Sequence, residues 1–125
     1  MKILIADDEE IIRSSIDLIL KRQGKYETDF ALDGEEAIKK VSDNFYDLVL
    51  LDLAMPKIDG YTVLKQIRVL YPKLPVVFVT GKGEAPKVAE SVAYDKLNGF
   101  VEKPFVPKDI LNAVGRLLKD KKPAI

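Results

Sequence analysis

Residues 47–58, DLVLLDLAMPKI, decide the fold class of this chain. Within the predicted strand 47–51, residues 48–51 carry consecutive aliphatic side chains, which is typical of a strand buried on both faces of a parallel sheet. Asp52 follows this run directly, and the next residues, LAMPKIDG, contain Pro, Asp and Gly, which favour turns. A buried strand that ends in an acid and then turns is expected to place a carboxylate at the edge of the sheet.

The pattern of a buried strand followed by an amphipathic helix repeats along the chain. Strands are predicted over 2–6, 26–31, 47–51, 75–80 and 99–103. Helices are predicted over 11–22, 35–42, 61–70, 85–94 and 107–119. Because crossovers between parallel strands are right-handed, this order predicts a doubly wound α/β domain. Its five-stranded parallel sheet carries helices on both faces.

Composition limits the possible functions. The 125 residues, 47% of them hydrophobic, suit one domain, predicted over 1–119, with 120–125 as a tail or linker and no DNA-binding domain. Twenty basic and twenty acidic residues cancel, so no global field attracts nucleic acid or a membrane. No apolar run approaches the roughly 20 residues that span a bilayer, so a cytoplasmic protein is expected. Because Cys and His are both absent, chemistry must rest on carboxylates, hydroxyls and lysines.

Polar side chains follow four of the predicted strands. The first strand is followed by DDEE at 7–10, the third by Asp52, and the fourth and fifth end in Thr80 and Lys103. In an open parallel sheet these carboxyl ends share one edge, where ligands bind. Each residue also has an ordinary structural explanation, namely helix capping, a turn, a strand residue or a solvated helix start. The conjunction of all of them at one edge favours a single site.

Three carboxylates and a lysine indicate a particular chemistry. Clustered carboxylates repel one another and need a cation, and Mg²⁺ takes one or two carboxylates while leaving room for phosphate oxygens. Asp7, Asp8 and Asp52 can supply ligands, and Asp52 can accept a phosphoryl group as an aspartyl phosphate. Thr80 and Lys103 can bind the phosphoryl oxygens. The pattern therefore predicts a chemical switch.

These residues resemble the receiver domain of bacterial two-component response regulators. The matching motifs, in family order, are ILIADDEE at 3–10, DLVLLDLAMPKIDG at 47–60, VVFVTGKG at 76–83 and GFVEKPF at 99–105. The resemblance implies a flavodoxin-like sheet of order 2-1-3-4-5. It also implies that Asp52 is the phosphoacceptor and that Mg²⁺ is held by Asp7, Asp8, Asp52 and the Ala54 backbone carbonyl.

The same resemblance implies a signalling role. Thr80 and Lys103 sense the phosphoryl group, and Phe100 is the switch aromatic. The phosphodonor is a sensor histidine kinase or a histidine phosphotransfer protein, the output goes to a downstream effector protein or domain, and external substrates are not turned over. Gly81, Pro86 and the segment YDKLNGF at 94–100 depart from the usual pattern of the family near the output surface.

Three alternatives come from other classes of protein. A dinucleotide-binding enzyme needs a Gly-rich turn after the first strand, where this chain has four acids. A phosphatase with an aspartate nucleophile places a second acid two residues after the nucleophile, where this chain has Ala54. A receiver-shaped interaction module that is never phosphorylated in the cell stays open as the main alternative.

The first predicted helix offers a surface for the phosphodonor. Its residues Ile12, Ile16, Ile19 and Leu20 form one arc that is expected to face the sheet. The residues expected to contact a partner helix beside the acidic site are Ile11, Ser14, Ser15 and Leu18, together with Pro104. A wide core face is the ordinary alternative for the two apolar residues.

Two further expectations concern the surroundings of Asp52. The Lys103–Pro104 bond is predicted to be cis, so that the lysine turns back toward the site. By the same resemblance, Ala54 and Lys82, two residues beyond Asp52 and Thr80, are expected to border the path of a water that attacks the phosphoryl group. Because neither side chain can orient that water, slow hydrolysis is predicted.

Overall fold

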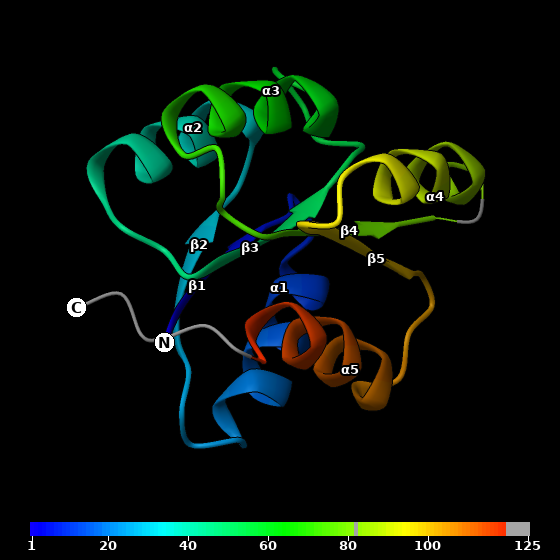
Figure 1. Cartoon of the computed structure of the whole chain (residues 1–125). Coiled ribbons are helices and arrows are strands. Elements are labelled where there is room, and N and C mark those ends of the chain that lie inside the picture. Colours follow the sequence, from blue (N-terminus) through cyan, green and yellow to red (C-terminus); the bar gives the residue numbers. More distant parts are fainter. Residues whose placement is uncertain (82, 120–125) are drawn as a thin grey trace.

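The computed structural model describes residues 1–81 and 83–119, and within them five strands alternate with five helices (Figure 1). The strands are β1 (Lys2–Ala6), β2 (Glu27–Ala31), β3 (Leu48–Asp52), β4 (Val76–Thr80) and β5 (Asn98–Glu102). The helices are α1 (Glu10–Lys21), α2 (Gly34–Asp43), α3 (Gly60–Leu70), α4 (Ala85–Tyr94) and α5 (Pro107–Leu118). None of these helices is long and apolar enough to cross a membrane.

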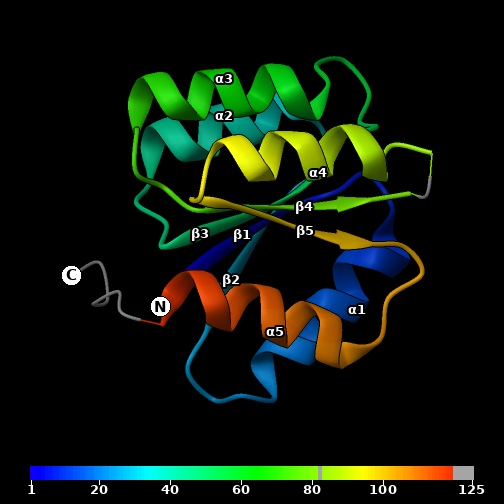
Figure 2. The same ribbon diagram turned by 45° about the vertical axis from the view of Figure 1, so that its right-hand side comes forward.

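The strands form one parallel sheet with the order β2-β1-β3-β4-β5, as predicted. Helices α2, α3 and α4 cover one face, and α1 and α5 cover the other (Figures 1 and 2). The chain therefore folds into the expected three-layer α/β domain, with β2 at an edge of the sheet.

The core has two halves, one on each face of the sheet. Val49 and Leu51 pack in the cluster beneath α2 and α3, whereas Leu48 and Leu50 pack in the cluster beneath α1 and α5. Successive residues of a strand point to opposite faces of the sheet, and helices cover both faces. All four side chains are therefore buried. This explains why the third strand is apolar without alternation.

Local sequence signals set the helix starts. The Asp33 carboxylate accepts from the Glu36 N–H at the start of α2, and the Asp59 carboxylate does the same for Thr62 in α3. No side-chain cap hydrogen bond precedes α1, where Asp7 instead accepts from the Glu9 N–H. Ordinary capping therefore does not explain the acids that follow β1.

The predicted boundaries hold to within one residue at each end. The third strand was predicted to stop at 51, but Asp52 is its last residue, because its backbone pairs with Val79 of β4. The fifth strand was predicted to include Lys103, which lies one residue beyond β5.

Candidate functional site

The ends of four strands bring the predicted polar residues to one edge of the sheet. Asp52 and Thr80 are the last residues of β3 and β4, while Asp7 and Lys103 directly follow β1 and β5. Asp7, Asp52 and Thr80 are almost completely buried, with 1%, 5% and 1% of their surface exposed. These polar residues therefore lie at the ends of the core strands and not in solvated loops.

Three carboxylates gather at this edge. Oxygen atoms of Asp7, Asp8 and Asp52 all lie within 4.8 Å of one another. Asp7 and Asp52 are buried and Asp8 is exposed, so the cluster opens to solvent on one side. An all-oxygen donor set that is open on one side fits a hard divalent cation such as Mg²⁺, which binds one or two carboxylates and keeps several waters.

Lys103, directly after β5, extends into the acidic cluster. Its Nζ lies 3.2 Å from Asp7 Oδ2, 3.6 Å from Glu9 Oε1 and 3.8 Å from Asp52 Oδ2. The backbone N–H of Lys103 donates to the Thr80 carbonyl at 2.7 Å, so the ends of β4 and β5 are tied together. The lysine thus offsets part of the negative charge of the cluster.

Burial governs the ionisation of the cluster. Burial, followed by the nearby Asp7 charge, raises the pKa of Asp52 to about 6, although Lys103 opposes the shift. Burial also raises the pKa of Asp7, against the Glu9 N–H and Lys103. For Lys103, burial lowers the pKa, but the carboxylates of Asp7 and Asp52 outweigh it, so the net pKa is raised. At neutral pH the site holds charges that the fold itself penalises.

The loop after β3 holds Asp52 in place. The Ala54 N–H donates to Asp52 Oδ1 at 3.2 Å, and the Gly60 N–H donates to the Leu53 carbonyl at 3.0 Å. Within this loop Lys57 adopts a left-handed backbone with φ of 68°. A Cβ at Gly60 would lie 2.7 Å from the Asp52 carbonyl oxygen, so only glycine lets α3 start this close to the acid.

The remaining predicted residues lie around the acidic cluster. Thr80 Oγ1 makes one long contact, 3.4 Å from the Gly81 carbonyl. Phe100 pairs in register with Phe78 and is half-buried against the cluster beneath α2 and α3. The Lys103–Pro104 bond is cis, as predicted. Lys82 lies outside the described residues.

The predicted partner surface on α1 is exposed. Ile11 and Leu18 expose 79% and 53% of their surface, and Ser14 is also exposed. Ser15 is half-buried, and Pro104 is exposed on the loop that follows β5. The arc formed by Ile12, Ile16, Ile19 and Leu20 packs toward the sheet, as predicted. An ordinary wide core face is therefore not the explanation for Ile11 and Leu18.

Sequence reasoning missed two residues near the acids. Arg13 Nη1 donates to the Asp7 carbonyl at 2.8 Å, and Glu9 Oε1 lies near Lys103. The only signal for Arg13 is a basic residue on the first turns of a helix that follows acids. Its contact depends on the rotation of α1 about its axis, which the sequence pattern fixes only approximately.

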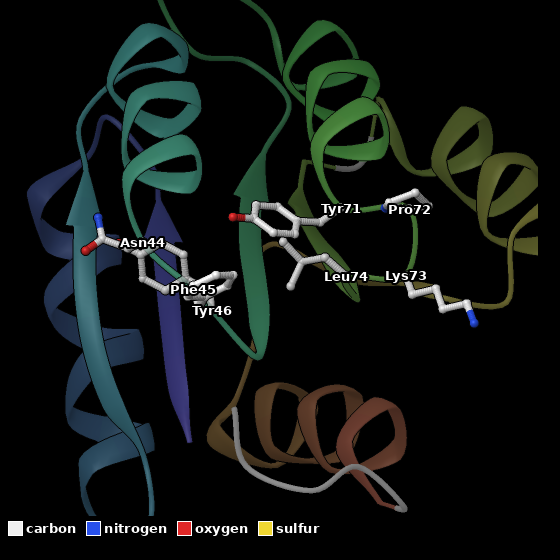
Figure 3. A pocket seen from close by; sticks show the side chains of 7 residues that line it. All are labelled: Asn44, Phe45, Tyr46, Tyr71, Pro72, Lys73 and Leu74. Carbon is white, nitrogen blue, oxygen red and sulfur yellow. The ribbon is translucent and has the colours of Figure 1, made fainter. Parts of the chain in front are cut away.

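An apolar hollow of about 420 Å³ lies away from the acidic site, at the opposite end of the sheet (Figure 3). It is lined by residues of the loops that follow α2 and α3, which are Asn44, Phe45, Tyr46, Tyr71, Pro72, Lys73 and Leu74. The rings of Phe45 and Tyr71 meet edge to face at 5.8 Å. None of the acidic residues borders this hollow, which therefore is not part of the strand-end site.

Comparison with known proteins identifies the family. The sequence pattern described as the response regulator receiver domain matches residues 3–115. This chain belongs to the response regulator receiver domain family. The solved receiver domain of NtrX from Brucella abortus is 31% identical, with a TM-score of 0.85, and the match covers 95% of this chain and 99% of that one.

Several curated relatives are named as transcriptional regulatory proteins. PhoP of Bacillus subtilis, named for alkaline phosphatase synthesis, is 36% identical in a match that covers 94% of this chain and 48% of PhoP. ResD of Bacillus subtilis is 38% identical over 118 residues, with coverages of 94% and 48%. The chain therefore spans about half the length of the curated relatives that it matches.

Proposed function

We propose that this receiver domain is a phosphorylation-dependent switch in which Asp52 accepts a phosphoryl group in the presence of Mg²⁺. The observation that carries the proposal is the gathering of the Asp7, Asp8 and Asp52 carboxylates within 4.8 Å, with Lys103 beside them. In this proposal residues 1–119 form the phosphoacceptor unit.

The transfer exchanges one bond to phosphorus for another. An anionic Asp52 oxygen attacks the phosphorus of a phosphohistidine, an O–P bond forms, and the P–N bond breaks. The released imidazole takes its proton from water, so no proton is required from the receiver domain. Because the pKa of Asp52 is about 6, most of this carboxylate is ionised and nucleophilic at neutral pH.

The residues of this chain share the remaining tasks. Bound Mg²⁺ would neutralise charge on the phosphoryl oxygens, with Asp7, Asp8, Asp52 and the Ala54 carbonyl as its protein ligands. Lys103 exchanges a carboxylate contact for a phosphoryl oxygen, and Thr80 donates its hydroxyl to another. Lys103 Nζ is already 3.8 Å from Asp52 Oδ2, so only a small movement is required.

The output is a change of surface. Thr80 contributes one long hydrogen bond in the resting state, so little holds its hydroxyl away from the phosphoryl group. When Thr80 moves, Phe100 fills the vacated space and reshapes the surface of α4, β5 and α5. A histidine kinase or histidine phosphotransfer protein is the proposed donor, and an effector protein or domain is the proposed receiver of the signal.

Incubation with acetyl phosphate and Mg²⁺ tests the proposal by intact-mass analysis. The wild-type protein is expected to gain one phosphoryl group, Asp52→Asn none, and the control Asp33→Asn the same amount as wild type. Asp33 caps α2, a role that Asn also fills. No uptake by any of the three proteins would favour the unphosphorylated interaction module, and equal uptake by all three would remove Asp52 as acceptor.

A further inference from the structure

Arg68, near the end of α3, joins three separate segments at the end of the sheet opposite the acidic site. Its Nε donates to Asp95 Oδ2 at 3.1 Å, its Nη1 to the Leu74 carbonyl at 2.5 Å and its Nη2 to Asn98 Oδ1 at 2.6 Å. Leu74 belongs to the loop before β4, Asp95 directly follows α4, and Asn98 begins β5. One guanidinium therefore ties α3 to the connection between α4 and β5.

The connection that Arg68 holds is well ordered by its own contacts. Asn98 is 2% exposed, and its N–H donates to the Asp95 carbonyl at 3.0 Å. The second oxygen of the Asp95 carboxylate accepts from the Leu97 N–H at 3.0 Å. Charge-assisted bonds of this kind are stronger than neutral ones, and here they are partly shielded from water. The C-terminal end of α4 is thus fixed to the body of the domain.

The other end of α4 lacks such an attachment within the described residues. A Cβ placed at Gly81 or at Gly83 would meet no atom within 4 Å, so these positions are open. Glu84 is exposed, and the first core contact of the described side chains in α4 comes from Val88, which is completely buried. In Figure 2 the end of α4 that leads into β5 lies on the same side as the end of α3, and the glycine-containing loop lies at the far end.

We propose that Arg68 is a positioning residue that makes the C-terminal end of α4 a fixed pivot, so that switching moves chiefly the glycine-flanked N-terminal end. This inference rests on the proposed function, because the displacement follows from the phosphoryl group at Asp52. Thr80 lies next to Gly81, so a movement of Thr80 acts directly on the free end of the helix.

A resting-state measurement tests the pivot without any phosphoryl group. Arg68→Met keeps an apolar stem of similar length and removes the three donors, while Lys65→Met changes an exposed cation on the same helix. In Arg68→Met the backbone N–H of Asn98 is expected to exchange with deuterium at least tenfold faster than in the wild type. The exchange rates of the backbone N–H groups of β1 and β3 are expected to stay unchanged. Equally faster hydrogen exchange in all strands would show that Arg68 stabilises the whole domain and does not act as a local pivot.

A second measurement follows the switch itself with Mg²⁺ and beryllofluoride as the phosphoryl mimic. In the wild type and in Lys65→Met, NMR shift changes are expected to be largest at Glu84, directly before α4, and to fade along α4 toward Asn98, the first residue of β5. In Arg68→Met they are expected to reach Asn98 with at least twice the wild-type size. If Arg68→Met is poorly folded, Asp95→Asn replaces it, since Asn still accepts from the Leu97 N–H while weakening the ion pair.

The outcomes of the two measurements separate the two proposals. An identical gradient along α4 in wild type and in both pivot variants would overturn the pivot. Absence of any shift change at Asp52 and Thr80 in all proteins would refute the phosphorylation switch. In that case the exchange rate of the Asn98 amide would still decide whether Arg68 fixes this end of α4.

Discussion

Asp52 is an acid whose charge the fold penalises, and this property has consequences at the scale of single residues. Burial and the Asp7 charge keep the Asp52 pKa near 6, whereas an unfolded chain would return it to its ordinary value of 3.8. Between these two values the folded state binds more protons than the unfolded state. Stability therefore falls as pH rises through this window, and then levels off above it.

Replacing Asp52 with Asn is expected to stabilise the metal-free protein. At pH 7.5 the gain in the free energy of unfolding should be about 3 kcal/mol, because roughly two pKa units of charge penalty are removed at about 1.4 kcal/mol each. Between pH 4 and pH 6 the wild type should lose stability more steeply than Asp52→Asn. Urea unfolding at each pH with EDTA present measures both effects. A less stable Asp52→Asn variant would contradict the proposed cost of burying the Asp52 charge. The same conclusion would follow if the free energy of unfolding depended on pH equally in both proteins.

Ala54 is expected to govern how long the phosphoryl group stays on Asp52. Its side chain is exposed beside the acceptor and has no polar atom that could orient an attacking water. Ala54→Asn should shorten the phosphorylated lifetime by on the order of tenfold, because an amide can position that water. The decay of the phosphorylated protein, followed by mass, measures the lifetime. Equal or slower decay in the variant would count against this role.

Strand-end residues were predictable from the sequence, but their side-chain contacts were not. Asp7, Asp52, Thr80 and Lys103 follow apolar runs, and parallel strands bring their carboxyl ends together by topology alone. The Arg68 contacts join residues up to 30 positions apart through a connection without periodic pattern. No local rule predicts which carbonyl or carboxylate a long flexible side chain reaches.

At the scale of elements, close approach of backbones explains where glycine is required. Gly60 begins α3 against the chain at Asp52 and Leu53, where a Cβ would lie 2.7 Å from backbone atoms. Gly115 lies within α5, where a Cβ would meet nothing within 4 Å. The two helical glycines therefore allow a matched comparison, because a side chain is expected to clash at Gly60 and to fit at Gly115.

Alanine at the two positions is expected to change stability in opposite directions. Gly60→Ala should destabilise the fold by on the order of 2 kcal/mol, because backbone must move. Gly115→Ala should stabilise it by about 0.5–1 kcal/mol through helix propensity. Chemical denaturation of both variants under the same conditions provides the comparison. A harmless Gly60→Ala would mean that α3 does not need to start this close to the acid.

The exposed face of α1 is expected to matter for a protein donor and not for a small one. Ile11→Lys should slow phosphoryl transfer from the cognate histidine donor by at least tenfold and leave uptake from acetyl phosphate unchanged. Val69→Lys on α3 serves as the control, since Val69 is 77% exposed and Ile11 is 79% exposed. Equal slowing with both donors would indicate damage to the acidic site instead of lost docking.

Element boundaries were predictable because apolar runs, capping acids and glycines coincide along this chain. The errors of one residue arise where pairing continues one step beyond the apolar pattern, as at Asp52. The apolar arc of α1 fixed its rotation approximately, well enough to predict which residues face the sheet but not the contact of Arg13 with Asp7. The hydrogen bonding at the start of α1 was not predictable from the sequence, because Asp7 accepts from the Glu9 N–H instead of capping the helix.

At the scale of the whole molecule, the two ends of the parallel strands carry different kinds of residue. The carboxyl ends of the strands collect the charged groups. The opposite end carries the Arg68 contacts, and the apolar hollow whose lining residues Figure 3 shows lies there too. Helix α4 extends between these ends on β4 and β5 (Figure 2). A chemical event at one edge can therefore move one end of a helix while the other stays in place.

The central claim is that Asp52 itself carries the phosphoryl group, and borohydride trapping tests it most directly. After incubation with acetyl phosphate and Mg²⁺, reduction converts an aspartyl phosphate to homoserine, which peptide mass spectrometry locates in the chain. Homoserine is expected at position 52 alone, dependent on Mg²⁺ and absent from Asp52→Asn. Homoserine at Asp7, Asp8 or any other aspartate, or none at position 52 in a protein that has gained phosphate, would contradict this assignment.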